Sequence, residues 1–315
     1  MTRAFVFPGQ GSQAVGMGRR LHDAVPAARL VFEEVDEALA EPLSRLIFEG
    51  PDDALRLTEN AQPALMATSV AAVRALEDIS GRRLPELCTV VAGHSLGEYA
   101  ALAAAGSIGL GDAARLLRLR GRAMQDAVPV GEGAMAAILG LDLAAVEEVA
   151  EAASAIGVCD VANDNAPGQV VVSGSRGAVE QAVELARARG ARRSVLLPVS
   201  APFHCRLLAP AAEAVAAALA EVALGMPAVP VVTNVAAAAE SAPEVLRARL
   251  VEQVTARVRW RESLLAMADL GIGTVVELGA GRVLSGLTKR TLPEVATVAL
   301  GAPDEIDAFV ATLAH

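Results

Sequence analysis

A serine flanked by glycines is the residue of this chain best suited to chemistry. The pentapeptide Gly93-His94-Ser95-Leu96-Gly97 follows a short apolar run and precedes a helical pattern. In such a strand–turn–helix the turn pushes the serine hydroxyl outward, and free N–H groups of the helix face the place where an oxyanion would form. The other interpretation is that Ser95 caps the helix, with Glu98 completing a capping box. The strand before the turn and the helix after it favour a nucleophile.

A serine nucleophile needs a general base, which is most often a histidine. The chain has four histidines. His315 is the last residue, His22 lies in a polar stretch, and His94 should point away from the hydroxyl if the turn is sharp. His204 remains, at a point where a strand pattern breaks before a helix. A capping or core histidine is the ordinary interpretation of such a position, but elimination favours His204 as the base.

The acidic third member of a catalytic triad has no obvious candidate. Hydrolases with this serine turn usually place an Asp or Glu between the serine and the histidine in chain order. The acidic residues between Ser95 and His204 fall mostly in expected helices or in an inserted unit, and none ends a strand of the expected main sheet. This pattern argues against an ordinary esterase.

A second glycine-rich turn, Gly9-Gln10-Gly11-Ser12-Gln13, follows the first strand pattern. It could cradle a phosphate, supply backbone donors, or be a turn without a function. It does not match a dinucleotide-binding fingerprint, because the next glycine is Gly16 and no acidic residue ends a second strand about 20 residues further on.

Arg120 is the most informative charge. It lies in a helical pattern over residues 112–125, on the apolar face, four positions from Leu116. A guanidinium buried there needs an anion. That anion is either an internal Asp or Glu or a substrate carboxylate, whose geometry a guanidinium matches with two hydrogen bonds. The opposite stripe, expected to be solvated, consists of Arg115, Arg118 and Arg122.

Strand and helix patterns alternate along the chain, which predicts an α/β fold. In the middle the order is β-α-β-β-α-β, which is typical of a ferredoxin-like unit. The expected strands there are residues 134–139, 156–161, 169–173 and 194–198, and the helices are 143–153 and 176–189. We therefore expect a large α/β domain of residues 1–126 and 199–315, interrupted by an inserted subdomain of residues 127–198. A helix is also expected over residues 63–77.

Composition excludes several classes of function. The net charge is −10, the only lysine is Lys289 and aromatic residues make up 3% of the chain, which argues against binding nucleic acid. The three cysteines have neither metal-site spacing nor a disulfide framework, which indicates a reducing compartment. The apolar run at the N-terminus is too short for a signal peptide, and no apolar stretch reaches 18 residues. A cytoplasmic protein with no membrane contact is expected.

Taken together, these motifs resemble the malonyl-CoA:acyl carrier protein transacylases of fatty-acid synthesis. The resemblance extends over essentially the whole chain, and the family fold is an α/β hydrolase-like domain with an inserted ferredoxin-like subdomain. The matching motifs are Phe5-Val6-Phe7-Pro8-Gly9-Gln10-Gly11-Ser12-Gln13, Gly93-His94-Ser95-Leu96-Gly97-Glu98-Tyr99, Leu119-Arg120-Gly121, Asn163-Asp164-Asn165-Ala166-Pro167-Gly168-Gln169, Pro202-Phe203-His204 and Gly286-Leu287-Thr288-Lys289-Arg290.

The resemblance assigns roles by position. It implies that Ser95 accepts the acyl group, that His204 is its base, and that Arg120 holds the malonyl carboxylate. The main-chain N–H groups of Gln10 and Leu96 would form the oxyanion hole. The main-chain carbonyl of Gln253 would orient the histidine, which would explain the missing acidic residue.

The resemblance also implies residues that line the site. Asn163 and Asn165 resemble residues of the cleft between the subdomains, and Gln62 matches a motif near the site. Phe203 stands where some members have serine. In related polyketide acyltransferases, phenylalanine at this place accompanies malonyl and serine accompanies methylmalonyl, because a bulky ring leaves little room for a methyl group.

The expected reaction is a ping-pong transfer of malonyl from malonyl-CoA to Ser95 and then to the phosphopantetheine thiol of acyl carrier protein. It needs no metal or redox cofactor, and a monomer is the expected state. One alternative is the same chemistry in another setting, as a discrete polyketide extender acyltransferase or the malonyl-transfer subunit of a malonate decarboxylase. Others are a serine thioesterase or esterase, and a catalytically silent carrier-protein docking module, against which the Ser95 and His204 pair counts.

Docking of an acidic carrier protein to an acidic chain requires a local positive patch. Two basic pairs are candidates, Arg192-Arg193 before the last strand of the inserted unit and Lys289-Arg290 at the end of a helix. They lie in different parts of the chain and could flank the entrance of a cleft. The alternative is that both pairs are ordinary solvated surface charges.

Overall fold

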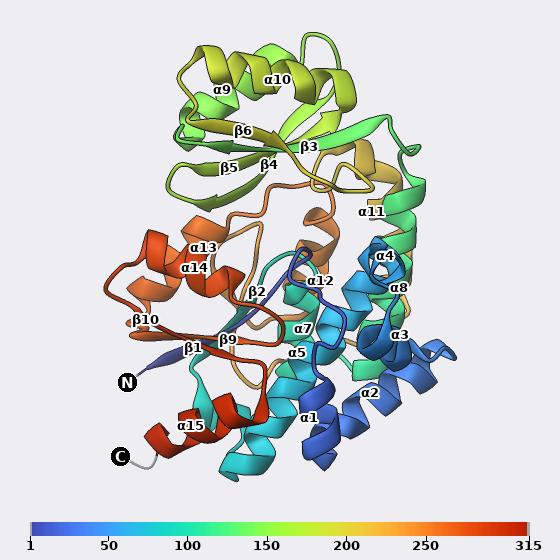
Figure 1. Cartoon of the computed structure of the whole chain (residues 1–315), viewed down its shortest axis with the longest axis vertical. Coiled ribbons are helices and arrows are strands. Elements are labelled where there is room, and N and C mark those ends of the chain that lie inside the picture. Colours follow the sequence, from blue (N-terminus) through green and yellow to red (C-terminus); the bar gives the residue numbers. More distant parts are fainter. Residues whose placement is uncertain (1, 314–315) are drawn as a thin grey trace.

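The fold is a mixed α/β structure with two separate sheets, seen in a computed structural model that describes residues 2–313 (Figure 1). The main sheet has six strands in the order β10-β9-β1-β2-β7-β8, and all neighbours are parallel except β7 and β8. Its strands are β1 (Arg3–Phe7), β2 (Val90–Gly93), β7 (Val231–Val232), β8 (Ala239–Glu240), β9 (Thr274–Leu278) and β10 (Ala296–Leu300).

The central strands of this sheet are buried on both faces, as their unbroken apolar sequences predict for parallel strands. Phe5 and Phe7 pack into a core on one face, whereas Ala4 and Val6 join a second cluster on the other. The parallel register pairs Phe7 with Gly93. Strands β1 and β2 therefore end side by side, and the two glycine-rich turns that follow them are neighbours.

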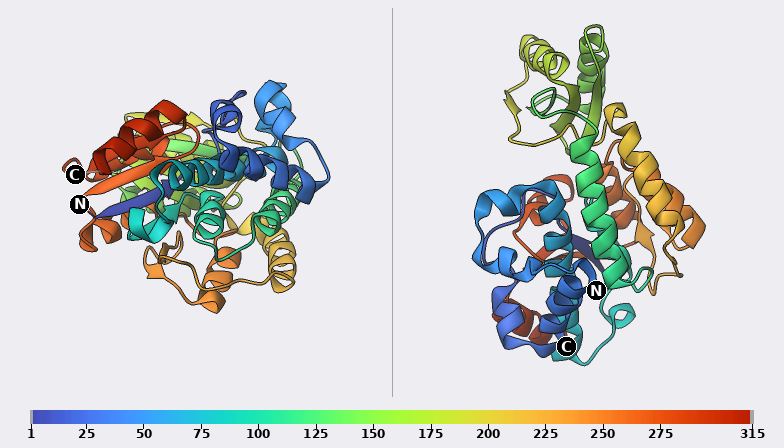
Figure 2. Two further views of the ribbon diagram at one scale, coloured as in Figure 1. Left: turned by 90° about the horizontal axis from the view of Figure 1, so that it is seen from below. Right: turned by 90° about the vertical axis from the view of Figure 1, so that its right-hand side faces the viewer.

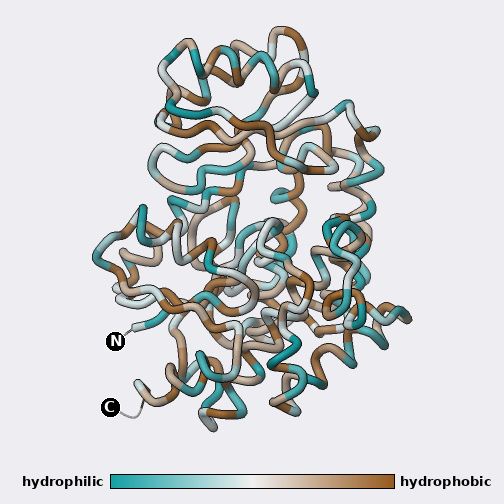
Figure 3. Tube along the Cα trace, in the orientation of Figure 1, coloured by the Kyte–Doolittle hydropathy of each residue, from teal (hydrophilic) through white to brown (hydrophobic). Residues whose placement is uncertain are grey.

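Helices cover both faces of the main sheet. Helices α13 and α14 supply the cluster on one face, and most of the others pack on the opposite face. In Figure 3 hydrophilic and hydrophobic stretches alternate along the outer helices, as expected for amphipathic helices with one buried side. These helices are α1 (Arg19–Ala24), α2 (Pro26–Leu39), α3 (Leu43–Glu49), α4 (Asp52–Arg56), α5 (Thr58–Ser80), α6 (Leu84–Leu87), α7 (Gly97–Ala104), α8 (Leu110–Asp126), the short 3₁₀ turn η1 (Arg206–Leu208), α11 (Ala209–Ala220), α12 (Pro243–Glu252), α13 (Trp260–Asp269), α14 (Val283–Thr291) and α15 (Pro303–Leu313). None of the helices in the described part of the chain combines the length and the apolar character needed to cross a bilayer.

The second sheet lies above the main one, at the end of α8 (Figure 2). It is antiparallel, with the order β4-β5-β3-β6, and the chain order β3-α9-β4-β5-α10-β6 agrees with the β-α-β-β-α-β pattern of the sequence. Its helices pack on one face, and Met135, Ala162 and Val171 on the other face join the core of the main domain. Its elements are β3 (Gly133–Leu139), α9 (Leu143–Ala153), β4 (Cys159–Ala166), β5 (Gln169–Ser175), α10 (Arg176–Ala188) and β6 (Arg193–Leu196).

Strand β4 begins and ends later than the sequence pattern predicts, and it includes Asn163, Asp164 and Asn165. The reason is a second partner from the far end of the chain. Asn163 forms a parallel bridge with Val258, whose N–H donates to Ala162 O at 2.8 Å. Polar residues that would otherwise favour a turn are thereby held in a strand.

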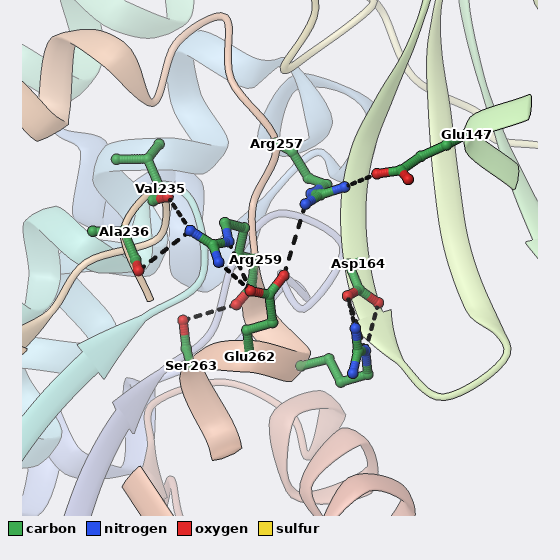
Figure 4. Close-up of polar contacts among 9 residues, drawn as sticks. Glu147, Asp164, Val235, Ala236, Arg257, Arg259, Glu262 and Ser263 are labelled. Atoms are coloured by element: carbon green, nitrogen blue, oxygen red, sulfur yellow. Dashed lines mark hydrogen bonds and ion pairs between the residues drawn. The ribbon is translucent and has the colours of Figure 1, made fainter. Parts of the chain in front are cut away.

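A cluster of arginines reinforces this junction (Figure 4). We call residues 257–261 the arginine segment. Arg261 Nη2 lies 2.8 Å from the buried carboxylate of Asp164, and Arg257 Nη1 lies 2.5 Å from Glu147 in α9. Arg259 pairs with Glu262 beside them. The segment therefore links the main domain to the second sheet through both backbone and side chains.

Helix α5 begins at Thr58, five residues earlier than the expected start at Pro63. A proline inside a helix leaves the carbonyl four residues before it without its helical hydrogen bond. That carbonyl belongs to Glu59, and Arg118 Nη1 donates to it at 3.0 Å. A side chain from α8 thus replaces the missing backbone donor.

The same contact corrects the prediction that Arg118 is solvated. Its side chain is 8% exposed, compared with 56% for Arg115 and for Arg122. Besides the Glu59 carbonyl, it binds Glu41 at 2.9 Å. Helical periodicity placed it on the outer stripe of α8, but α5 lies close enough to cover it.

Candidate active site

The turn after β2 has the sharp geometry that its sequence predicts. Ser95 has φ of 53°, a left-handed conformation that is uncommon outside glycine. A Cβ at Gly93 would lie 1.9 Å from the carbonyl carbon of Gly97, and a Cβ at Gly97 would lie 2.3 Å from Phe7 O. Glycine is therefore required on both sides of Ser95, because the turn folds back on itself and against β1.

The capping-box interpretation of this turn is wrong. The N–H of Ser95 donates to Asn234 Oδ1 at 2.7 Å, and not to Glu98. Asn234 Nδ2 in turn donates to Gly93 O at 2.7 Å. The side chain of Asn234, which follows β7, therefore clamps the turn from the neighbouring strand of the main sheet.

Ser95 and His204 form a hydrogen-bonded pair. Ser95 Oγ lies 2.8 Å from His204 Nε2, and His204 Nδ1 lies 2.8 Å from the main-chain oxygen of Gln253. A carbonyl only accepts hydrogen bonds, so Nδ1 carries the proton and Nε2 is free to accept from the serine hydroxyl. The expected contact between the histidine and the Gln253 carbonyl is thus present.

Burial, together with the positive charge of Arg120, lowers the pKa of His204 to about 3. The imidazole is therefore neutral at neutral pH, the form in which it can accept a proton from Ser95. Of the other histidines, His94 lines the same cavity, but its ring contacts other partners: Nε2 lies 2.8 Å from Asn165 Oδ1, and the ring packs against Trp260. His315 lies outside the described residues.

Arg120 is buried beside Ser95, with only 2% of the residue exposed. Its Nη2 donates to Ser95 Oγ at 3.1 Å and to Gln253 Oε1 at 2.9 Å, and its Nη1 donates to Gln62 Oε1 at 2.6 Å. All three acceptors are neutral. Within residues 2–313 no carboxylate lies at salt-bridge distance from this guanidinium. The interpretation of Arg120 as half of an internal ion pair is therefore wrong, and among the described residues its charge has no direct counter-ion.

The main-chain N–H groups proposed for an oxyanion hole are free for a ligand. In the described part of the chain, neither Gln10 nor Leu96 donates its N–H to a protein acceptor. Both residues line the cavity that contains Ser95. The side chain of Gln10 is anchored separately, because its Oε1 accepts from Thr58 Oγ1 at 2.9 Å.

The cavity at this site has a volume of about 430 Å³ and takes its walls from both sheets. The main domain contributes the turns after β1 and β2, and the second sheet contributes Asn163 and Asn165. Phe203, the residue before His204, is nearly buried in the wall of the cavity. The predicted residues that line it are Gln10, Gln62, Ser95, Leu96, Arg120, Asn163, Asn165, Phe203 and His204.

Comparison with known proteins agrees with this geometry. Residues 4–312 match the family model described as acyl transferase domain. The chain belongs to this acyl transferase family. A malonyl CoA-acyl carrier protein transacylase of Bacillus subtilis is 45% identical over 98% of this chain and 96% of its own length. An acyl-carrier-protein-S-malonyltransferase from Bartonella henselae is 53% identical with a TM-score of 0.97, and each chain is covered completely.

A further structural relative was solved with its partner. It is described as a type II PKS acyl-carrier protein in complex with its malonyl-transacylase. The present chain is 40% identical to that structure, with a TM-score of 0.95, and the match covers 99% of the present chain and 100% of the other.

The four basic residues considered for docking are all exposed and lie apart from the cavity lining. Arg290 Nη1 donates to Gln169 Oε1 at 2.6 Å, which joins α14 to the start of β5. Gln169 is opposite Leu139, and Leu139 is opposite Arg193. At about 5 Å per strand, Arg193 is therefore roughly 10 Å from Gln169 across the sheet. Both pairs, Arg192-Arg193 and Lys289-Arg290, lie toward the same end of the second sheet.

Three features of the site were missed by the sequence analysis. Asn234 was overlooked, although a polar residue at the carboxyl end of a main-sheet strand is a useful signal in α/β folds. Glu98 was considered only as a cap. Gln253 was given only a main-chain role, yet its side chain donates to Ser95 O at 3.1 Å and to Glu98 Oε2 at 2.8 Å.

Proposed function

We propose that this acyltransferase moves a malonyl group from malonyl-CoA to the phosphopantetheine thiol of acyl carrier protein. The observation that carries the proposal is the buried guanidinium of Arg120, 3.1 Å from Ser95 Oγ and bonded only to neutral oxygens in the described chain. A buried cation that lacks a counter-ion favours the binding of an anion, and the planar guanidinium matches a carboxylate with two hydrogen bonds. Malonyl differs from acetyl by such a carboxylate.

The first half-reaction forms malonyl-Ser95. His204 Nε2 accepts the hydroxyl proton of Ser95 while Oγ attacks the thioester carbonyl. The carbon–sulfur bond then breaks, and the leaving sulfur takes the proton from His204, so that coenzyme A departs as a thiol. Negative charge on the carbonyl oxygen would be stabilised by the free N–H groups of Gln10 and Leu96.

The second half-reaction reverses these steps with a different thiol. The phosphopantetheine thiol gives its proton to His204 and its sulfur attacks the ester carbonyl. The ester bond to Ser95 Oγ breaks, and the serine regains its proton from His204. Malonyl is then bonded to the carrier protein and the enzyme is restored, without a metal or redox cofactor.

Selectivity in this scheme comes from two sides of the cavity. Arg120, supported by Gln62, would bind the malonyl carboxylate. The ring of Phe203 would restrict the space next to the α-carbon and so disfavour methylmalonyl. Asn163 and Asn165 would line the path of the acyl group from the second sheet.

The proposed partner is an acyl carrier protein. The structural relative solved with a carrier protein supports this partner, because its transacylase and this chain have nearly the same fold. We place the docking surface at Arg192, Arg193, Lys289 and Arg290, since both pairs lie toward the same end of the second sheet. A discrete polyketide acyltransferase would use the same chemistry. The carrier protein that this enzyme prefers would distinguish fatty-acid synthesis from a polyketide pathway.

We further infer an α/β hydrolase-like large domain, residues 1–126 and 199–315, with a ferredoxin-like subdomain inserted at residues 127–198. The strand order β4-β5-β3-β6 and the two helices on one face of that sheet support the subdomain assignment. We propose that the protein acts as a monomer in the cytoplasm. The free, buried state of Cys88, Cys159 and Cys205 is consistent with a reducing compartment.

The experiment is intact-mass analysis after mixing with malonyl-CoA, followed by addition of holo acyl carrier protein. We expect a malonyl adduct that requires Ser95, disappears in Ser95→Ala and moves to the carrier protein. Acetyl-CoA serves as the matched acyl donor without a carboxylate. Steady release of free malonate with no adduct and no transfer would replace the proposal by a thioesterase.

A further inference from the structure

Glu98 is a buried acid that the reaction scheme above leaves unused. It lies in the first turn of α7, three residues after Ser95, and is 0% exposed. Its Oε2 accepts from the main-chain N–H of Asn234 at 3.0 Å and from Gln253 Nε2 at 2.8 Å. Its Oε1 has no hydrogen-bond partner among residues 2–313. Burying a carboxylate costs free energy, so the burial of Glu98 at this position needs an explanation.

Both donors belong to residues that hold the catalytic pair in place. Asn234 Oδ1 accepts from Ser95 N at 2.7 Å, and the main-chain oxygen of Gln253 lies 2.8 Å from His204 Nδ1. The side chain of Gln253 also accepts from Arg120 at 2.9 Å. The carboxylate oxygen Oε2 of Glu98 is therefore connected to the site through one intervening residue in each case. Asn234 connects it to Ser95, and Gln253 connects it to His204 and Arg120.

We propose that Glu98 is a positioning residue for malonyl transfer, whose Oε2 fixes Asn234 and Gln253 and through them Ser95, His204 and Arg120. In a triad the acid contacts the histidine directly. Here a glutamine lies between them, and the acid acts as a shared hydrogen-bond acceptor. The inference rests on the proposed function, because it concerns the rate of that reaction.

The electrostatics of the site are consistent with an acceptor role. Burial raises the pKa of Glu98 to about 7, although the bonds from Asn234 and Gln253 and the charge of Arg120 all act to lower it. A proton on the unpaired Oε1 leaves Oε2 free to accept both bonds. Glutamine has the same shape and can also present one oxygen to both donors, whereas methionine fills the space without an acceptor.

A buried acid elsewhere in the chain provides the matched control. Glu277 in β9 is also 0% exposed, and it accepts from Leu284 N at 3.0 Å and from Ser285 N at 2.8 Å. These contacts hold the start of α14 and do not reach the catalytic pair. Glu277→Gln therefore reports the general effect of altering a buried carboxylate that binds backbone donors.

The test is a series of Glu98→Gln, Glu98→Asp and Glu98→Met, with Glu277→Gln as control, in the full-length enzyme. The kcat and KM for malonyl-CoA are measured together with the NMR signal of the His204 Nδ1–H proton in the free enzyme. Circular dichroism and thermal melts establish folding. Glu98→Asp keeps the acceptor but withdraws it by one methylene.

We expect Glu98→Gln to retain kcat within about threefold and to keep the parent Nδ1–H signal. Glu98→Met should lose roughly 10–100-fold in kcat, as expected for a small misplacement of reacting groups, with a smaller change in KM and a shifted or broadened signal. Glu98→Asp should fall between them, and Glu277→Gln should leave kcat and the signal unchanged.

Three results would overturn the proposal: a folded Glu98→Met with parent kcat, a Glu98→Gln as slow as Glu98→Met, or an unchanged His204 signal throughout the series. If Glu98→Met does not fold, the comparison of kcat between Glu98→Gln and Glu98→Asp tests the proposal. A Glu98→Asp enzyme at least as fast as Glu98→Gln would contradict it. Failure of the proposed function can be distinguished from failure of this proposal, because in that case the parent enzyme itself would not form a malonyl adduct.

Discussion

Arg120 and Ser95 are in direct contact, with guanidinium Nη2 3.1 Å from the hydroxyl oxygen. The serine therefore accepts one hydrogen bond from a cation while it shares its proton with His204. A group bound to Arg120 by its carboxylate would have its other end next to the nucleophile. In the proposed reaction, substrate recognition and bond formation would thus involve adjacent atoms of the same site.

We predict that Arg120→Ala impairs malonyl transfer far more than acetyl transfer. Charge-assisted hydrogen bonds contribute roughly 1.5–3 kcal/mol each, so the loss in malonyl preference should be on the order of 10–10⁴ in kcat/KM. Arg118→Ala is the matched control, since Arg118 is also buried in α8 but contacts Glu41 and Glu59 instead. Equal losses for the two acyl groups would rule out a carboxylate clamp.

We predict that Gln253→Ala lowers malonyl transfer although its main-chain carbonyl remains. Its side chain donates to Ser95 O and Glu98 and accepts from Arg120. Losing this support should cost about 5–30-fold, at roughly 1–2 kcal/mol for the bonds that are lost. His204→Ala, which removes the base, should cost roughly 10²–10⁴. A Gln253→Ala enzyme with parent rates would mean that only the main chain matters.

The rate of acylation should not fall as the pH is lowered through the usual pKa of histidine. Since burial lowers the pKa of His204 to about 3, the base stays neutral as pH falls through 6.5 and protonates only near pH 3. Rapid-mixing measurements of kcat/KM from pH 5 to 8 would test this. The same profile in Glu98→Gln removes any contribution from Glu98. A loss of activity with a midpoint near 6.5 in both enzymes would contradict the expectation.

The ion pair between Asp164 and Arg261 should contribute to stability because the carboxylate is buried. Arg261→Ala should lower the free energy of unfolding by roughly 1.5–3 kcal/mol, the range for a hydrogen bond to a charged group. Arg45→Ala, at an exposed pair with Glu49, should change it by less than about 1 kcal/mol. Urea unfolding of both variants provides the comparison, and equal small effects would mean that the junction does not depend on this pair.

Charge reversal at Arg193 and Lys289 should raise the KM for acyl carrier protein, and added salt should do the same to the parent enzyme. The KM for malonyl-CoA should rise less. Reversal of Arg45, an exposed arginine in α3, is a control for net charge. Unchanged carrier kinetics in the double reversal at low salt would place docking on another surface.

Local patterns were sufficient to single out Ser95, His204 and Arg120, which the structure brings into contact. Ser95 sits in a recognisable turn, and Arg120 breaks the apolar face of a helix. Asn234, Glu98 and the Gln253 side chain were not predictable in the same way, because their partners are distant in sequence. Asn234 lies 139 residues from Ser95, and Gln253 lies 155 residues from Glu98.

The differences in the fold have the same origin. A start at Pro63 is a sound expectation for an isolated helix, but a guanidinium from α8 supplies the donor that lets α5 begin at Thr58. Likewise, β4 continues through Asn163 because Val258 pairs with it. In both cases a tertiary contact satisfies a backbone group that local sequence leaves unsatisfied.

The bridge between Val258 and Asn163 also covers part of an open edge of the second sheet. Strand β4 is an edge strand, and open edges are templates for pairing with other chains. The segment around Val258 covers part of this edge, while the other edge strand, β6, has only four residues. A fragment cut to residues 127–198 would expose the β4 edge and tend to self-associate. The arginine segment thus shields part of the second sheet from pairing with other molecules.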